Sequence, residues 1–188
     1  TIVIWTTDHG DGLPRAKRDL FDSGIKVPMI VRWPDGWERG TRIDRLVSFI
    51  DLAPTILRMA NVRVPEHLQG SDFVEDAPRR FVYASRDRVD DFYDRRRAVR
   101  DHQFKYIKNW YPEKPSGHWL SYRDNIPMVR ELRQLFESDQ LSGDQRKWFE
   151  PPGVEELYKL SDDPHELNNL ARNGEYEQDR QRLKSQLE

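Results

Sequence analysis

The sequence predicts an α/β fold joined to a small α+β unit that contains a four-stranded antiparallel sheet. Three observations support this. Two apolar runs of strand-forming residues, 1–5 and 27–33, flank a polar loop, as buried parallel strands do. From Ile50 onward, apolar residues recur at a helical period. Farther along, short alternating segments precede a helix-forming terminal stretch.

Composition limits the classes of protein that this chain can represent. Its 188 residues can bury one substantial core, but hydrophobic residues are only 36% and charged residues 34%, which fits part of a larger domain. A net charge of −2 gives no reason to expect a nucleic-acid or membrane partner. The lack of cysteine excludes disulfides and thiolate metal sites. No apolar run approaches the roughly 20 residues that span a bilayer.

The first loop carries the residues best suited to chemistry. Asp8 and His9 follow the first strand, and the carboxyl ends of parallel strands are where open α/β sheets bind ligands. A carboxylate beside an imidazole can hold a cation, and Lys17 can reach an anion bound to that cation. A metal and a lysine together neutralise the charge that builds on a sulfuryl or phosphoryl group during transfer. Asp8-His9-Gly10 is equally compatible with a simple turn.

Two helices are expected in the first part of the chain. Pro14 favours the start of a short helix within 11–23, with Lys17 just beyond it. A longer helix is expected to begin around Asp51, with Pro54 in its first turn. Asp51 is suited to cap that helix, and a metal-ligand role for it is the weaker alternative.

The second unit is predicted from short strands of similar composition. A hairpin is expected around residues 101–103, and a terminal helix at 176–187 is expected to cover one face of the sheet. Another helix is expected across 128–138. A polar, proline-containing stretch near 76–80 divides the chain into units 1–77 and 78–188. The four expected strands are 81–85, 96–100, 104–109 and 157–160.

Residues 86–95 combine three arginines with four aspartates, and mixed charge of this kind is typical of a solvated face. The alternative is a loop that binds an acidic sugar, with arginine for carboxylate or sulfate and aspartate for hydroxyl groups. Tryptophan and tyrosine residues within 110–152 fit either packing of an irregular segment or stacking on sugar rings.

Several motifs together resemble the late catalytic segment and C-terminal end of sulfatases. The set covers most of the chain, and its spacing is most similar to the branch that contains heparan N-sulfatase and its bacterial relatives. The matching segments are Asp8-His9-Gly10, Leu13-Pro14-Arg15-x-Lys17, and the stretches 20–34, 47–55 and 156–171.

This resemblance implies the C-terminal part of an alkaline-phosphatase-like α/β/α sandwich, with the N-terminal half of the catalytic domain missing from the chain. The sulfatase nucleophile, a formylglycine made from Cys or Ser in Cys/Ser-x-Pro-x-Arg, has no counterpart here. The family implies a divalent metal, usually Ca²⁺, with Asp8 as a ligand. His9 is implied either as a second ligand or as a contact to the sulfate or nucleophile, and Lys17 as the group that holds a sulfate oxygen.

The resemblance also assigns substrate contacts to Arg86, Asp87 and Arg88. The expected activity of the whole protein is hydrolysis of sulfate esters or sulfamates on a sugar or glycosaminoglycan, in a periplasmic, secreted or lysosomal-type compartment, with this fragment inactive alone. Two alternatives stay open. One is a phosphate or phosphonate monoester hydrolase of the same superfamily, and the other is a non-catalytic module that binds sulfated glycans.

Overall fold

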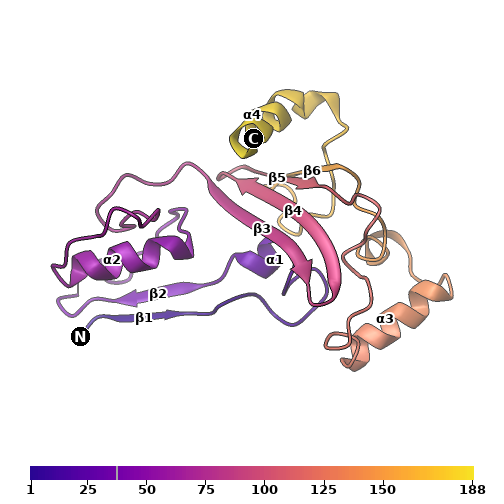
Figure 1. Ribbon diagram of the computed structural model, residues 1–188, viewed down its shortest axis with the longest axis horizontal. Coiled ribbons are helices and arrows are strands. Elements are labelled where there is room, and N and C mark those ends of the chain that lie inside the picture. Colours follow the sequence, from indigo (N-terminus) through magenta and orange to yellow (C-terminus); the bar gives the residue numbers. More distant parts are fainter. Residues whose placement is uncertain (37) are drawn as a thin grey trace.

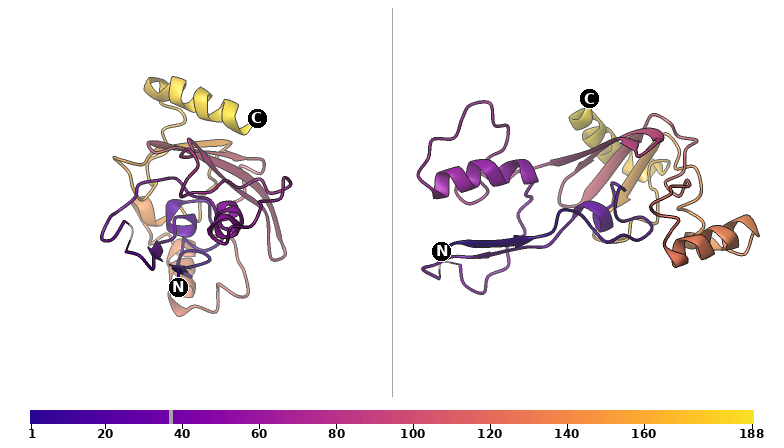
Figure 2. Two further views of the ribbon diagram at one scale, coloured as in Figure 1. Left: turned by 90° about the vertical axis from the view of Figure 1, so that its left-hand side faces the viewer. Right: turned by 60° about the horizontal axis from the view of Figure 1, so that its bottom comes forward.

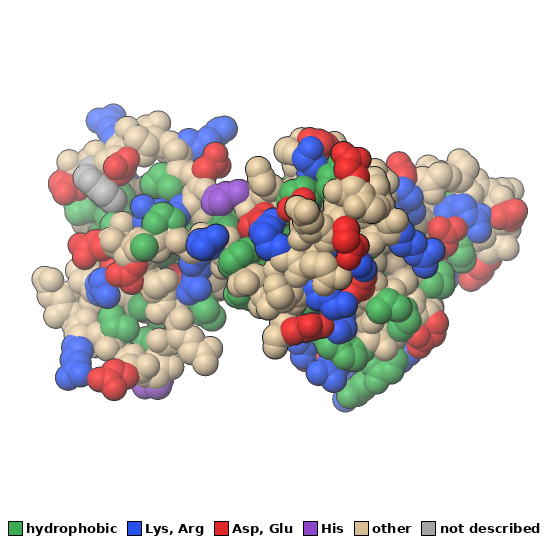
Figure 3. Space-filling view, turned by 90° about the horizontal axis from the view of Figure 1, so that it is seen from above, with side chains coloured by type: hydrophobic (Ala, Val, Ile, Leu, Met, Phe, Trp, Pro, Cys, Tyr) green, Lys and Arg blue, Asp and Glu red, His purple; other side chains and the backbone are tan. Residues whose placement is uncertain are grey.

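The computed structural model describes residues 1–36 and 38–188, which form an α/β structure with two separate antiparallel sheets (Figure 1). A two-stranded ribbon pairs β1 with β2, and a four-stranded sheet has the order β3-β4-β5-β6. The molecule narrows between the part that holds the ribbon and the part that holds the larger sheet (Figure 3). The strands are β1 Val3–Thr6, β2 Met29–Arg32, β3 Val82–Val89, β4 Phe92–Arg100, β5 Phe104–Asn109 and β6 Glu155–Lys159.

The first two strands correct one prediction. They were expected as buried parallel strands, but β1 and β2 are antiparallel, with Val3 opposite Arg32, and Trp5 and Ile30 are more than half exposed. The ribbon projects away from the larger sheet (Figure 2). Parallel pairing needs a crossover of a dozen or more residues. Here the Gly10 N–H donates to the Gly24 carbonyl at 2.9 Å, so the two ends of the connecting loop lie side by side. The chain therefore leaves the loop in the reverse direction, and β2 runs antiparallel to β1.

The helix expected around Asp51 forms, but it starts with a single 3₁₀ turn. Residues Phe49–Asp51 form that turn and α2 spans Leu52–Met59, with Pro54 in its first turn as predicted. The Asp51 carboxylate accepts the Ser48 N–H at 3.0 Å in a capping box, so it caps the 3₁₀ turn rather than α2 itself. The short helix expected to start near Pro14 does not form, and the helix of this stretch, α1, is Asp22–Ile25.

The four-stranded sheet confirms the predicted antiparallel architecture. Its β4–β5 hairpin turns at 101–103, where the Asp101 carboxylate accepts the N–H groups of Gln103 and Phe104. Residues 86–95 are not a loop, because β3 and β4 continue through them to a tight turn at Asp90, whose φ is 53°. Charged side chains on both faces of these strands remove the alternation of apolar and polar residues from which strands are predicted.

Each face of this sheet is covered by a different segment. The terminal helix α4, Glu177–Leu187, buries Leu183 against Val99 and Leu157. On the opposite face, Leu20 and Phe21 pack on side chains of β4 to β6, so the segment around α1 lies under the sheet while α4 lies above it (Figure 1). The remaining helix, α3 at Pro127–Glu137, packs on a cluster of its own with Trp148.

Candidate active-site loop

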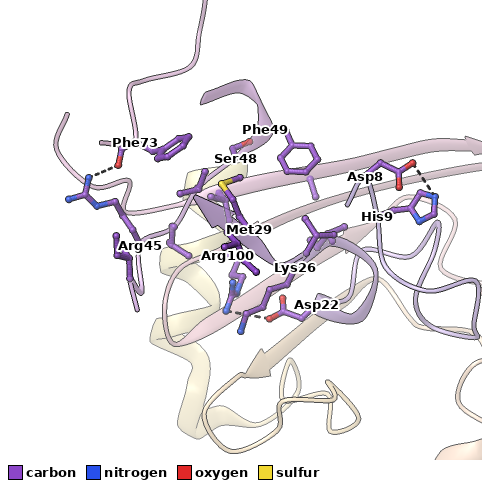
Figure 4. A pocket seen from close by; sticks show the side chains of 18 of the residues that line it. Asp8, His9, Asp22, Lys26, Met29, Arg45, Ser48, Phe49, Phe73 and Arg100 are labelled. Atoms are coloured by element: carbon purple, nitrogen blue, oxygen red, sulfur yellow. Dashed lines mark hydrogen bonds and ion pairs between the residues drawn. The ribbon is translucent and has the colours of Figure 1, made fainter. Parts of the chain in front are cut away.

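Asp8 and His9 face one another directly after β1 (Figure 4). His9 Nε2 lies 3.4 Å from Asp8 Oδ2, and the Asp8 side chain is 86% exposed. His9 Nδ1 lies 2.7 Å from the Gly10 carbonyl oxygen, which can only accept, so Nδ1 carries the hydrogen. In the neutral ring, Nε2 therefore turns a lone pair toward a carboxylate. Two acceptors at this distance repel each other unless a proton or a cation lies between them.

The backbone of this loop is closely tied to itself. A Cβ added to Gly10 would lie 1.8 Å from the Ser23 carbonyl oxygen, so only glycine allows this approach. The Lys17 N–H donates to the Asp11 carbonyl at 2.9 Å. Arg15 and Arg18 both have positive φ. The stretch 10–24 is therefore a compact turn structure in which one residue cannot shift without its neighbours.

Lys17 lies on another side of this loop. Its Nζ is 5.2 Å from the centroid of the Tyr122 ring, which the Arg18 guanidinium also approaches at 5.1 Å. Arg18 in turn pairs with Asp90 at 2.9 Å. The structure thus brings Asp8 and His9 together but directs the Lys17 ammonium toward an aromatic ring. Its predicted contact with a sulfate would require another rotamer of its four-carbon stem.

A cavity of about 1780 Å³ lies beside Asp8 and His9 (Figure 4). Its described lining comes from the site loop, from residues 26–36 and 38–49, from residues 73–74, and from the sheet at 82–90 and 100–102; it includes Arg18 but not Lys17. Cations and carboxylates both face this space. They include Lys26, Asp22 and Arg100, of which the last two pair at 3.3 Å.

The three predicted substrate residues Arg86, Asp87 and Arg88 all line this cavity, but their environments differ. Arg86 is only 8% exposed, and its guanidinium contacts the Asp19 and Asp94 carboxylates. Asp87 is exposed and accepts both hydrogen bonds of a bidentate contact from Arg97. Arg88 remains largely exposed, with its Nε donating to the Asp90 carbonyl at 2.6 Å. Asp87 and Arg88 are thus the more accessible members of this set.

Asp51, the weaker candidate for a metal ligand, has its carboxylate oxygens fully used by protein donors. They accept the Ser48 and Ser71 N–H groups and a two-point contact from the Arg79 guanidinium. Burial raises the pKa of Asp51, but these hydrogen bonds outweigh it and hold that pKa below its usual value. The side chain therefore organises backbone rather than facing the cavity.

Sequence reasoning missed a buried charge cluster under the larger sheet. Lys105 on β5 is 0% exposed, and its ammonium lies 2.7 Å from both Asp22 Oδ1 and Glu166 Oε1. Burial raises the pKa of Glu166, and Lys105 opposes that rise. The only sequence signal was a lysine that shares its strand face with the apolar Ile107.

Over residues 1–36 and 38–188, no group of three or more His, Cys, Asp or Glu side chains is arranged to hold a metal ion. In the same part of the chain, no helix is both long and apolar enough to cross a membrane. A cation bound by Asp8 and His9 would therefore need further ligands.

Comparisons with known proteins give a consistent result. Residues 15–142 match the family model described as N-sulphoglucosamine sulphohydrolase, C-terminal. An ulvan-active sulfatase from Formosa agariphila is 40% identical over all of this chain, which spans 32% of that protein. The structure of a 2-O GAG sulfatase matches with a TM-score of 0.70 at 20% identity, over 98% of this chain and 35% of that one.

A phosphonate monoester hydrolase from Agrobacterium radiobacter shares the fold with a TM-score of 0.62 at 20% identity, over 98% of this chain and 34% of that one. The chain thus spans about a third of the length of each of these proteins.

Proposed function

This chain belongs to the sulfatase family by its C-terminal region, and we propose that it is the C-terminal part of an enzyme that removes sulfate from a sulfated sugar or glycosaminoglycan. The 40% identity to an ulvan-active sulfatase and the fold shared with a 2-O GAG sulfatase support a polyanionic carbohydrate as substrate. In the whole enzyme, residues 1–77 would complete an alkaline-phosphatase-like sandwich whose N-terminal half is outside this chain.

The observation that carries the proposal is the facing pair Asp8 and His9. A carboxylate oxygen and an imidazole nitrogen 3.4 Å apart fit two adjacent positions of a cation's coordination shell. Calcium takes about six to eight ligands, mostly oxygen, so this pair is part of a site that the N-terminal half would complete. A bound divalent cation would supply charge stabilisation for a sulfuryl group during transfer.

The remaining residues of this chain have roles in holding the substrate. Lys17, released from Tyr122, would donate to a sulfate oxygen as negative charge builds there. Arg88 and Asp87, exposed on the cavity wall, offer a cation for a second acidic group and a carboxylate for sugar hydroxyls. The nucleophile, a formylglycine, would come from outside this chain.

Two alternative functions differ from this proposal, one in the ester that is cleaved and the other in having no catalysis. The phosphonate monoester hydrolase has the same fold, and the imidazole of His9 also suits zinc, so phosphate or phosphonate esters are the second candidate. A non-catalytic module that binds sulfated glycans is the third. It would have no use for a carboxylate and imidazole that face each other at a cation-binding distance.

The deciding experiment uses the full-length protein that contains this chain. Sulfate release from sulfated ulvan and glycosaminoglycan oligosaccharides is measured by ion chromatography, beside 4-nitrophenyl sulfate and 4-nitrophenyl phosphate. We expect sulfate release from at least one oligosaccharide and a kcat/KM for the aryl sulfate well above that for the phosphate. A preference for the phosphate would favour the second candidate, and binding of oligosaccharide without turnover would favour the third.

A further inference from the structure

We propose that two buried cations of the four-stranded sheet, Lys105 and Arg86, are positioning residues that hold the segment Asp19–Asp22 and thereby fix the loop that carries Asp8, His9 and Lys17. This inference rests on the proposed function for its catalytic consequence, but its structural part does not. It gives Arg86 a positioning role in place of the substrate contact that the sequence suggests.

Lys105 forms the first attachment. Its ammonium forms ion pairs with Asp22 Oδ1 and Glu166 Oε1, each at 2.7 Å, and donates a hydrogen bond to the Leu20 carbonyl at 3.0 Å. Arg100 adds a contact of 3.3 Å to the other oxygen of Asp22. The Asp22 N–H itself donates to Glu166. One end of the segment is therefore bound through both its side chain and its backbone.

Arg86 forms the second attachment. It binds Asp19, which lies three residues before Asp22 in the chain. Its Nη1 donates to Asp19 Oδ1 at 2.6 Å and to the Arg18 carbonyl at 2.8 Å, and its Nη2 contacts Asp94. The indole N–H of Trp148 donates to the other oxygen of Asp19 at 3.2 Å. Burial raises the pKa of the Asp19 carboxyl. Arg86 and the other partners lower this pKa by more than burial raises it, so the carboxylate stays charged.

Movement of this segment would be passed on to the site. A Cβ on Gly24 would lie 2.3 Å from the Ala16 carbonyl oxygen and 2.5 Å from that of Asp19, so the backbone at Gly24 packs closely against the turn at residues 16–19. The bonds Gly10 to Gly24 and Lys17 to Asp11 continue this contact to the residues next to Asp8 and His9. Two anchors on the sheet thus determine where the whole loop sits.

Stability alone does not account for this arrangement. Taking charges out of water costs several kcal/mol for each ion, and well-packed apolar replacements of buried ion pairs are often neutral or stabilising. What buried ions held by several directed contacts supply is a single geometry. A fixed geometry is what a loop with metal-binding and substrate-binding side chains requires.

The test uses the full-length protein and two variants that change the charges around Lys105. Asp22→Asn removes one anchoring charge and keeps the pair between Lys105 and Glu166. The double variant K105M/E166Q removes that pair and leaves Asp22 with Arg100. Lys108→Met is the matched control, because Lys108 lies on the same strand in an exposed pair with Glu188 at 3.3 Å.

Amide hydrogen exchange is the first readout and does not depend on activity. We expect peptides within residues 8–25 to exchange at least tenfold faster in both variants, with β4 and β5 unchanged and the control like wild type. Unchanged exchange in residues 8–25 would overturn the proposal. An equal increase in loop and sheet would also overturn it, since that outcome indicates a general stabilising role.

Steady-state kinetics is the second readout. We expect kcat to fall at least tenfold in both variants while KM changes less than threefold, because the loop would be displaced in part of the population. A variant with loose exchange but normal kcat would overturn the catalytic part. If the wild-type protein releases no sulfate, the proposed function fails, and hydrogen exchange still decides whether the two anchors hold the loop.

Discussion

Residues 26–77 and residues 78–188 are organised by different forces. The apolar clusters that the structure describes lie in the second region, with Leu20 and Phe21 joining one of them from the site loop. Residues 26–77 are organised instead around one carboxylate, Asp51, which binds the backbone at Ser48 and Ser71 and the Arg79 guanidinium. The second region therefore buries its own apolar side chains, whereas the first relies on directed hydrogen bonds.

The difference also shows on the surface. Large apolar side chains of the first region remain exposed, and hydrophobic groups are visible there among charged ones (Figure 3). Apolar surface of this kind marks a face that packs on something else, which agrees with the proposal that the rest of a catalytic domain covers it. The side chains are Ile30, Ile43, Phe49, Ile50, Ile56 and Val62.

The largest expected effect tests the polar organisation of the first region. Asp51→Ala leaves the buried side of Arg79 and two backbone N–H groups without partners, and breaking a buried pair in this way costs about 3–5 kcal/mol. Denaturant unfolding of the protein measures it, with the exposed Asp44→Ala as control. A cost near that of the control would remove Asp51 as the organiser of residues 26–77.

The second prediction tests the apolar organisation of the other region. Leu157 is fully buried in the cluster between the sheet and α4, so Leu157→Ala should lower the free energy of unfolding by about 2–5 kcal/mol. Val154→Ala, at a mostly exposed position just before β6, should change it by less than about 0.5 kcal/mol. Similar values for the two variants would contradict the assignment of this core.

The third prediction concerns the loop at residues 8–25, which precedes the first region and packs on the second. In the full-length enzyme, Lys17→Ala should lower kcat on the order of 100-fold, because a donor to the developing charge is lost. Lys108→Ala, at a position whose side chain pairs with Glu188 next to α4, should leave kcat unchanged. If Lys17→Ala has normal kcat, the ammonium stays on Tyr122 during turnover and has no part in the reaction.

The smallest expected effect is a pH dependence in the second region. Burial lowers the pKa of His118 to about 4, with Arg123 adding to the effect, and its ring stacks on Phe92 at 3.5 Å. The unfolded chain binds this proton near pH 6.5 and the folded chain only near pH 4, so stability should be lost as pH falls between these values.

His118→Gln should flatten this dependence. The expected difference in Tm between pH 7 and pH 4.5 is a few degrees for the wild type, which corresponds to a change on the order of 1 kcal/mol. Thermal unfolding by circular dichroism measures it. An equally steep fall of Tm in the variant would assign the acid sensitivity to other groups.

Local pattern was sufficient for much of the second region. Alternation of apolar residues in 104–109 and the turn at 101–103 predicted the β4–β5 hairpin, and helical periodicity predicted α2. The helices expected at 128–138 and 176–187 form as α3 and α4 to within a residue or two. It failed at 86–95, where side chains of both faces are charged and the strands are stabilised by pairs such as Arg97 with Asp87. Those pairs form only when the two strands lie side by side.

By itself, the sequence determined the family, the strands and helices with clear apolar periods, and the adjacency of Asp8 and His9, because each of these depends on residues close together in the chain. Only the tertiary structure decided that β1 and β2 run antiparallel, that Arg86 is turned inward, and that Lys105 meets Asp22 and Glu166. These features join residues that are far apart along the chain. Whether such charges end in solvent or in a buried pair depends on which partner the fold brings to them.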